Sequence, residues 1–114
     1  MPDLYDGPII DSHHHVWDLG LARHPWLAAG ARVAHRYGDY EPIKRDYLPA
    51  DYLRDIAGTG IVASVYMEAE WVPGDGLAEV RTVERYREES GVPGSMVAQA
   101  WLDAPDAADR LAEE

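Results

Sequence analysis

The sequence predicts an α/β fold with a parallel sheet, and three observations lead to this class. Strand-like segments alternate with amphipathic, helix-like ones along the chain. The segment 61–68 (IVASVYME) is nearly continuously apolar, which is typical of a strand covered on both sides in a parallel sheet. The second and third strand-like segments begin at residues 61 and 95, a separation that suits a right-handed βαβ unit.

The first predicted strand, residues 9–16, follows Gly7-Pro8 and contains three consecutive histidines. Strand alternation places Ile9, Asp11, His13 and His15 on one face and Ile10, Ser12, His14 and Val16 on the other. Residues 18–47 show no clean period and predict a long loop, with a helical turn near 26–29. A loop of this length indicates either function or disorder.

Two further units follow the loop. Pro49 suits the first position of a helix that Gly58 and Gly60 end, and the strand 61–68 comes next. Asp75 is the predicted N-cap of a helix over 76–90, which Gly91 closes. The segment 95–102 predicts a third strand, and Pro105 opens a third helix that runs to residue 114. We expect neighbouring parallel strands in a single partial domain over 1–114.

Composition narrows the functional classes. The chain has 114 residues, 46% of them hydrophobic, and its 10 basic and 21 acidic residues give a formal charge of −11. This balance argues against a nucleic-acid partner. Without cysteine, a transition metal has to be held by imidazole and carboxylate groups. The acidic N-terminus is unlike a secretory signal and no apolar run reaches bilayer length, so we expect a cytoplasmic protein without a membrane partner.

His13 and His15 are the strongest candidates for a metal site. In parallel α/β folds, catalytic and ligand-binding groups gather at the carboxyl ends of strands, where this pair is expected. Alternate residues of a strand point the same way, roughly 6.5–7 Å apart by the rise per residue, so both imidazoles can reach one ion. The alternative, a solvated histidine-rich strand end, is the weaker interpretation for this pattern. His14 turns to the other face and is not predicted to be a ligand.

IIDSHHHVWD at 9–18 resembles the first-strand motif of the amidohydrolase superfamily, in the branch of metal-dependent TIM-barrel hydrolases with sugar-lactone hydrolases and 2-pyrone-4,6-dicarboxylate lactonase. Other similar stretches are HPWL at 24–27, AHRYGDY at 34–40, RDYLPADYL at 45–53, VYMEAEW at 65–71 and VAQAWLDAPD at 97–106. The resemblance implies the first three βα units of a (β/α)₈ barrel. Because such a barrel takes about 250 residues, we expect a truncated, N-terminal portion of a longer enzyme.

The resemblance also implies a chemistry. His13 and His15 would be catalytic metal ligands, completed by histidines and an aspartate on later strands. A divalent ion, with Zn²⁺ the first choice, would activate water for attack on a lactone, ester or amide carbonyl of a small molecule. In related enzymes with weakly bound or absent metal, the same two histidines would polarise the carbonyl or bind a substrate carboxylate.

Trp17, Glu68 and Glu70 are the candidates for substrate binding. The two glutamates end the second strand on one face and could bind a substrate hydroxyl, although a solvated strand end is an equally good interpretation. Trp17 could wall a pocket for a ring-shaped substrate, or anchor the loop by burying area. His24 and His35 are expected at the surface. A solvated helix face is expected for Glu79, Arg81, Glu84, Arg85 and Glu88.

Two functions from different classes are therefore open. The first is the opening section of a metal-dependent hydrolase. The second is a non-catalytic remnant or interaction module that pairs through open sheet edges. In either case the apolar surface left by a three-stranded sheet predicts self-association of the isolated chain.

Overall fold

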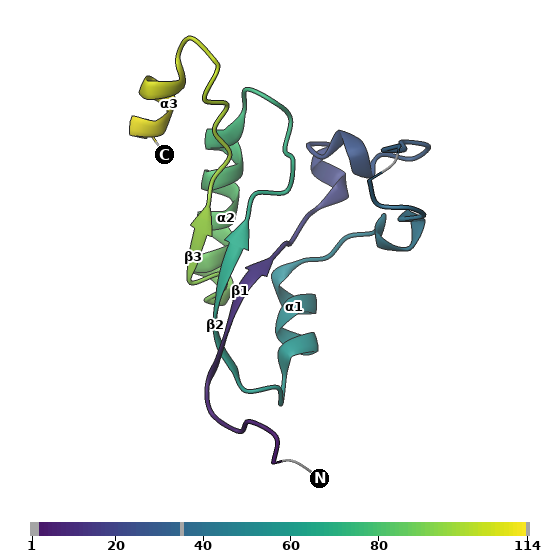
Figure 1. Ribbon diagram of the computed structural model, residues 1–114, viewed down its shortest axis with the longest axis vertical. Coiled ribbons are helices and arrows are strands. Elements are labelled where there is room, and N and C mark those ends of the chain that lie inside the picture. The colour runs from purple at the N-terminus through teal and green to yellow at the C-terminus, as the bar shows by residue number, and fades with distance from the viewer. Residues whose placement is uncertain (1–2, 35, 114) are drawn as a thin grey trace.

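The fold is a small parallel sheet with helices in its crossovers, as the sequence predicts. The computed structural model describes residues 3–34 and 36–113, and within them one three-stranded sheet has the order β1-β2-β3 with both pairs parallel. The strands are Ile9–His14, Ile61–Met67 and Ser95–Val97, and the α-helices α1, α2 and α3 are Pro49–Ile56, Gly76–Ser90 and Ala107–Glu113. Figure 1 shows the long first loop beyond the carboxyl end of β1, and α3 set apart from the sheet. The predicted fold class is confirmed.

The element bounds differ from the prediction mainly at the carboxyl ends of the strands. β1 ends at His14 instead of residue 16, β2 one residue early, and β3 stops at Val97 instead of residue 102. The predicted bounds of α2 are confirmed, although Asp75 caps it without a side-chain hydrogen bond. The long loop contains 3₁₀ turns at Leu19–Leu21, Pro25–Leu27 and Glu41–Ile43. No described helix is long and apolar enough to cross a membrane.

The predicted face of Asp11 is wrong. The pairing between β1 and β2 shifts register between Asp11, opposite Ser64, and His14, opposite Tyr66. As a result the Asp11 carboxylate accepts a hydrogen bond from the Tyr52 hydroxyl of α1 at 2.7 Å, and the His14 ring stacks on the same tyrosine. Asp11 therefore lies with His14 on the α1 side of the sheet, because strict alternation does not survive a register shift.

The second strand is covered on one face and open on the other. On the covered face Ser64 and Tyr66 are buried, the tyrosine at 1% exposure. On the open face Ala63 is exposed, and Ile10, its partner on the neighbouring strand, is 65% exposed. The expectation that β2 is covered on both sides is therefore wrong among the described residues, because nothing there packs on the second face.

The contact between β2 and α2 is built on a buried glutamate. Glu79, predicted on a solvated helix face, is fully buried. Its carboxylate accepts hydrogen bonds from the Tyr66 hydroxyl at 2.8 Å and from the Ala69 amide at 3.1 Å. Burial and the adjacent Glu79 carboxylate raise the pKa of the Tyr66 hydroxyl, so it stays protonated as a donor. The arrangement locks α2 against the carboxyl end of β2.

We predict that Tyr66→Phe lowers the free energy of unfolding by about 2–3 kcal/mol, because the buried Glu79 carboxylate then loses one of its hydrogen-bond donors. Urea unfolding followed by circular dichroism measures the change. Tyr5→Phe is the matched control: Tyr5 is 71% exposed and donates to the Pro8 carbonyl, so its loss should cost less than about 0.5 kcal/mol. Equal effects of the two changes would contradict this account of the β2–α2 contact.

Candidate functional site

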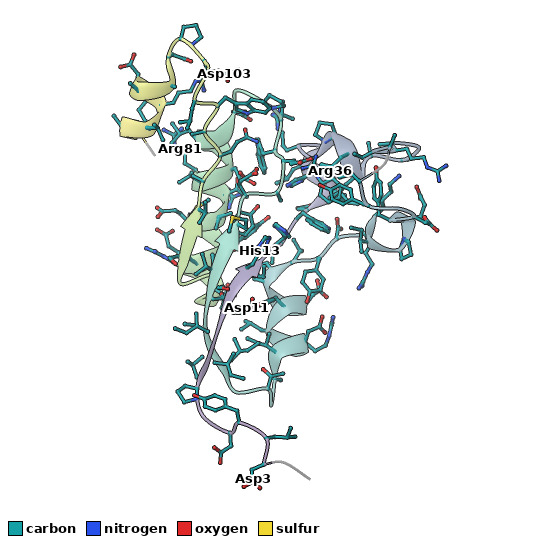
Figure 2. The ribbon with its side chains drawn as sticks, viewed as in Figure 1. Asp3, Asp11, His13, Arg36, Arg81 and Asp103 are labelled. Carbon is teal, nitrogen blue, oxygen red and sulfur yellow. The ribbon has the colours of Figure 1, made fainter. Side chains whose placement is uncertain are left out.

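His13 and His15 lie together at the carboxyl end of β1. Their ring centroids are 5.1 Å apart, with an angle of 85° between the ring planes. Figure 2 shows His13 at the head of β1, above Asp11. Two imidazoles that bind one zinc ion tetrahedrally, with Zn–N distances of about 2.0–2.1 Å, have ring centroids about 5 Å apart. The spacing of the two rings therefore fits a shared metal ion.

The backbone of β2 sets the orientation of His15. Its Nδ1 lies 2.8 Å from the carbonyl oxygen of Met67, the last residue of β2. A carbonyl only accepts, so Nδ1 carries the proton and Nε2 keeps its lone pair. Burial lowers the pKa of His15, an effect that the Met67 hydrogen bond partly opposes, so the ring is neutral near pH 7. A neutral imidazole held by a backbone carbonyl is the usual form of a metal-ligating histidine.

The described residues do not form a complete metal site by themselves. Among them no group of three or more histidine, cysteine, aspartate or glutamate side chains is placed to hold a metal ion. A tetrahedral zinc ion needs four ligands. The pair His13 and His15 offers at most two of these ligands, and the spacing and imidazole chemistry of the pair fit a divalent metal.

His14 is separated from this pair, as the sequence predicts. It is 7% exposed, and its ring stacks on Tyr52 of α1 at 4.0 Å. Burial lowers the pKa of His14, while the nearby Asp11 carboxylate acts in the opposite direction. The middle ring of the run thus packs between sheet and helix.

Trp17 closes the base of the long loop and also adjoins His15. Its backbone exchanges two hydrogen bonds with Tyr47, at 2.8 and 3.0 Å, and its indole donates to the Arg45 carbonyl. The indole is 9% exposed, and the His15 ring lies nearly parallel to it at 6.0 Å. Trp17 and His15 line one side of a cavity of about 320 Å³. Trp17 thus anchors the loop and also lies beside the candidate site.

Glu68 and Glu70 line a different, larger cavity of about 700 Å³ beyond β2 and β3. A Glu68 carboxylate oxygen accepts from the Glu70 amide at 2.9 Å, and Gln99 Nε2 lies 3.4 Å from the same oxygen. Glu70 has a left-handed backbone with φ of 52° and forms an ion pair with Arg36 of the loop at 2.8 Å. A non-glycine residue in this region is strained, a feature that often accompanies functional sites.

His24 belongs to the interior, and its predicted surface position is wrong. It is 5% exposed, and its ring packs edge-on against Trp71 at 5.3 Å and against Trp17 at 6.2 Å. Burial, with the nearby His15 ring as a smaller cause, lowers the pKa of His24 to about 4. A loop sequence without periodicity does not indicate which side chains are buried, so only the tertiary structure shows that His24 is buried. His35 lies outside the described residues.

Sequence reasoning also missed two contributors to this region. The residue types do not point to the Met67 carbonyl, because every residue has a backbone carbonyl. Arg36 sits in a loop without pattern, and only its ion pair with Glu70 shows that the loop folds back onto the β2 end. Gln99 of the segment after β3 also lines the larger cavity.

Comparison with known proteins identifies two similar chains. No protein-family model matches the chain. An uncharacterized protein of Sinorhizobium fredii, y4mH, is 32% identical over 110 residues, which are 96% of this chain and 37% of that protein. A crystal structure of an amidohydrolase from Burkholderia multivorans with bound zinc is 29% identical and covers 95% of this chain, with a TM-score of 0.60.

The similarity extends over a part of each known protein. This chain spans 34% of the Burkholderia amidohydrolase and 37% of the Sinorhizobium protein. The agreement in fold and sequence with a zinc-containing amidohydrolase supports a relationship of this chain to the amidohydrolase superfamily. The motifs of the sequence indicate the same relationship.

We predict that burial of neutral His24 makes the fold sensitive to acid. Its pKa of about 4 lies below the unfolded value of 6.5, so between these pH values the unfolded chain takes up a proton that the folded chain refuses. Stability is therefore lost as the pH falls from 6.5 to 4, by up to about 3 kcal/mol from this group. His24→Phe should lose less stability over this range in urea unfolding. Parallel curves for variant and wild type would refute the assignment.

Proposed function

We propose that this chain supplies the first-strand metal-binding pair of an amidohydrolase-type hydrolase that cleaves a lactone, ester or amide bond of a small molecule. The proximity of the His13 and His15 rings, whose centroids are 5.1 Å apart, is the observation that carries this proposal. The similarity to a zinc-containing amidohydrolase supports it. The same pair is the proposed catalytic group, and Trp17, Glu68 and Glu70 are the proposed substrate contacts.

The chain's own residues have defined tasks in this proposal. His13 and His15 would hold the divalent metal, for which zinc is our first choice. When bound, the metal supplies Lewis acidity, which polarises the carbonyl and lowers the pKa of a bound water. The Met67 carbonyl oxygen, 2.8 Å from Nδ1 of His15, keeps the proton on that nitrogen, so that the lone pair of Nε2 is the one left for a metal.

The tautomer of His15 also bears on a reaction without metal. With Nδ1–H bound to Met67, the Nε2 atom of neutral His15 accepts but does not donate a hydrogen bond. It therefore has no proton with which to polarise a carbonyl oxygen. This favours the metal-dependent route over direct action of the imidazole on the substrate.

The remaining ligands would come from outside the described residues. Two imidazoles leave at least two positions of a tetrahedral ion to be filled, one of them by water in a catalytic site. Because the chain corresponds to about a third of the two similar proteins, we propose that the full site includes later βα units.

A second candidate function, an interaction module, is favoured by the open side of the sheet. β1 and β3 are the outer strands of the described sheet, and Ile10 and Val97 on their open face are 65% and 46% exposed. Exposed apolar strands at free edges are a common route to pairing between chains. We propose a second copy of this chain as the partner of this open face.

We predict that the chain binds Co²⁺ or Zn²⁺ through His13 and His15. His13→Ala and His15→Ala should each weaken binding at least about tenfold, the lower bound seen even for loss of an outer-shell partner. Cobalt absorption and zinc titration calorimetry measure the change. His14→Phe is the matched control, because the His14 ring stacks on Tyr52 of α1 and is not one of the proposed ligands. Equal metal content in wild type and the double alanine variant would overturn the proposal.

Hydrolysis is tested with the protein loaded with Zn²⁺ or Mn²⁺ against a panel of lactones, esters and amides. Turnover that disappears in both alanine variants and persists in His14→Phe supports the proposed activity. Turnover that is unaffected by removal of His13 and His15 contradicts it.

We also predict concentration-dependent self-association through the open face of the sheet. The formal charge of −11 opposes association, so added salt should strengthen it by screening. Ile10→Lys should shift the species towards monomer in light scattering, because Ile10 is 65% exposed on that face. Leu4→Lys is the control with the same charge change, since Leu4 is 86% exposed on the segment before β1. A monomer at every concentration and salt level would refute this prediction.

A further inference from the structure

The larger cavity lies beside the histidine pair but has its own lining. Its volume is about 700 Å³, and it begins at Met67 and Glu68, where β2 ends. The carbonyl of Met67 is the group that holds His15. A small molecule in this cavity would therefore lie next to the proposed metal pair, with room for a group that does not take part in the reaction.

Three tryptophans contribute to the walls of this cavity. Trp26, Trp71 and Trp101 line it, three of the four tryptophans in the chain. The indole N–H of Trp26 donates to the Ala69 carbonyl at 2.9 Å, and that of Trp71 donates to the Asp75 carboxylate at 3.0 Å. These two indoles have thus used their only hydrogen-bond donor, and what they offer a ligand is apolar surface and π-electron density.

The charges around the cavity are unbalanced. Arg36 is the one cationic side chain among the described lining residues, and it is already paired with Glu70 at 2.8 Å. Glu68 forms no ion pair with any described residue, and the Glu70 amide and the Gln99 side-chain amide are its neighbours. The residual charge of the lining is therefore negative, in a chain that itself carries −11.

From the tryptophan walls and the unneutralised Glu68 we propose that this cavity binds an organic cation, such as a substituted ammonium group. A cation gains both from the π-faces of tryptophan and from the carboxylate. An anion would be repelled by the Glu68 carboxylate, and Arg36 is already paired with Glu70. The inference rests on the proposed function: the ammonium group would be the non-reacting end of the ester, lactone or amide substrate.

Choline and its uncharged isostere 3,3-dimethyl-1-butanol provide a matched pair of probes. The two have the same shape and differ in the charge of the quaternary centre. Quenching of tryptophan fluorescence reports binding, because three of the four tryptophans line the cavity. The titrations are done on the full chain in metal-free buffer, so that no step depends on a loaded metal.

We expect saturable binding of choline that is at least about tenfold tighter than that of the alcohol, in keeping with a desolvated cation–π contact. Glu68→Gln keeps the side-chain shape and should remove most of this preference. Glu88→Gln, on the exposed surface of α2, is the control for the change in net charge and should leave the preference intact. Trp101→Leu should weaken choline binding severalfold, since Trp101 is a cavity wall that is 53% exposed.

Two results would overturn the inference. Equal binding of choline and the alcohol would show a merely apolar cavity, and absence of binding by either would show no such site. The proposed function fails separately, if His13 and His15 of the wild-type chain do not bind metal. A chain that binds metal but shows no cation preference refutes this inference alone, whereas a chain with the preference and without metal binding refutes the hydrolase proposal.

Discussion

The hydrogen bond between Tyr66 and the fully buried Glu79 is the interaction on which the arrangement of the site depends. It joins β2 to α2 in the interior, where a carboxylate is tolerated only when its hydrogen bonds are satisfied. The same carboxylate also accepts from the Ala69 amide, just beyond the strand. The path of the chain from Tyr66 to Ala69 is thereby held in place, and this path contains both the Met67 carbonyl and Glu68.

The orientation of His15 follows from this fixed segment. Met67 accepts the Nδ1 proton of His15, and the edge of the Tyr66 ring lies against the same histidine at 6.3 Å. From the other side Trp17 stacks on His15, while its backbone pairs with Tyr47 and closes the long loop. The half-buried His15 ring is thus positioned by β2 and by the base of the loop, which is the kind of support that keeps an imidazole in a single geometry.

The long loop acts as a wall of the site because polar contacts tie it to the end of β2. The Trp26 indole donates to Ala69, the Val72 amide donates to Arg23, and Arg36 pairs with Glu70. The loop buries His24 at a cost in stability at acid pH, and it contributes aromatic surface to the larger cavity. Function and stability are linked here, since the contacts that shape the cavity also order a segment with no periodic structure of its own.

The sequence by itself determined the class of fold, the parallel order, the bounds of α2 and the pairing of His13 with His15, because these follow from local periodicity and residue type. Only the tertiary structure decided the side on which Asp11 lies, the burial of Glu79 and His24, and the partner of His15. A register shift, a buried carboxylate and a backbone carbonyl leave no mark in a pattern of residue types. They arise when segments distant in sequence meet, and each must then satisfy the hydrogen bonds of the other.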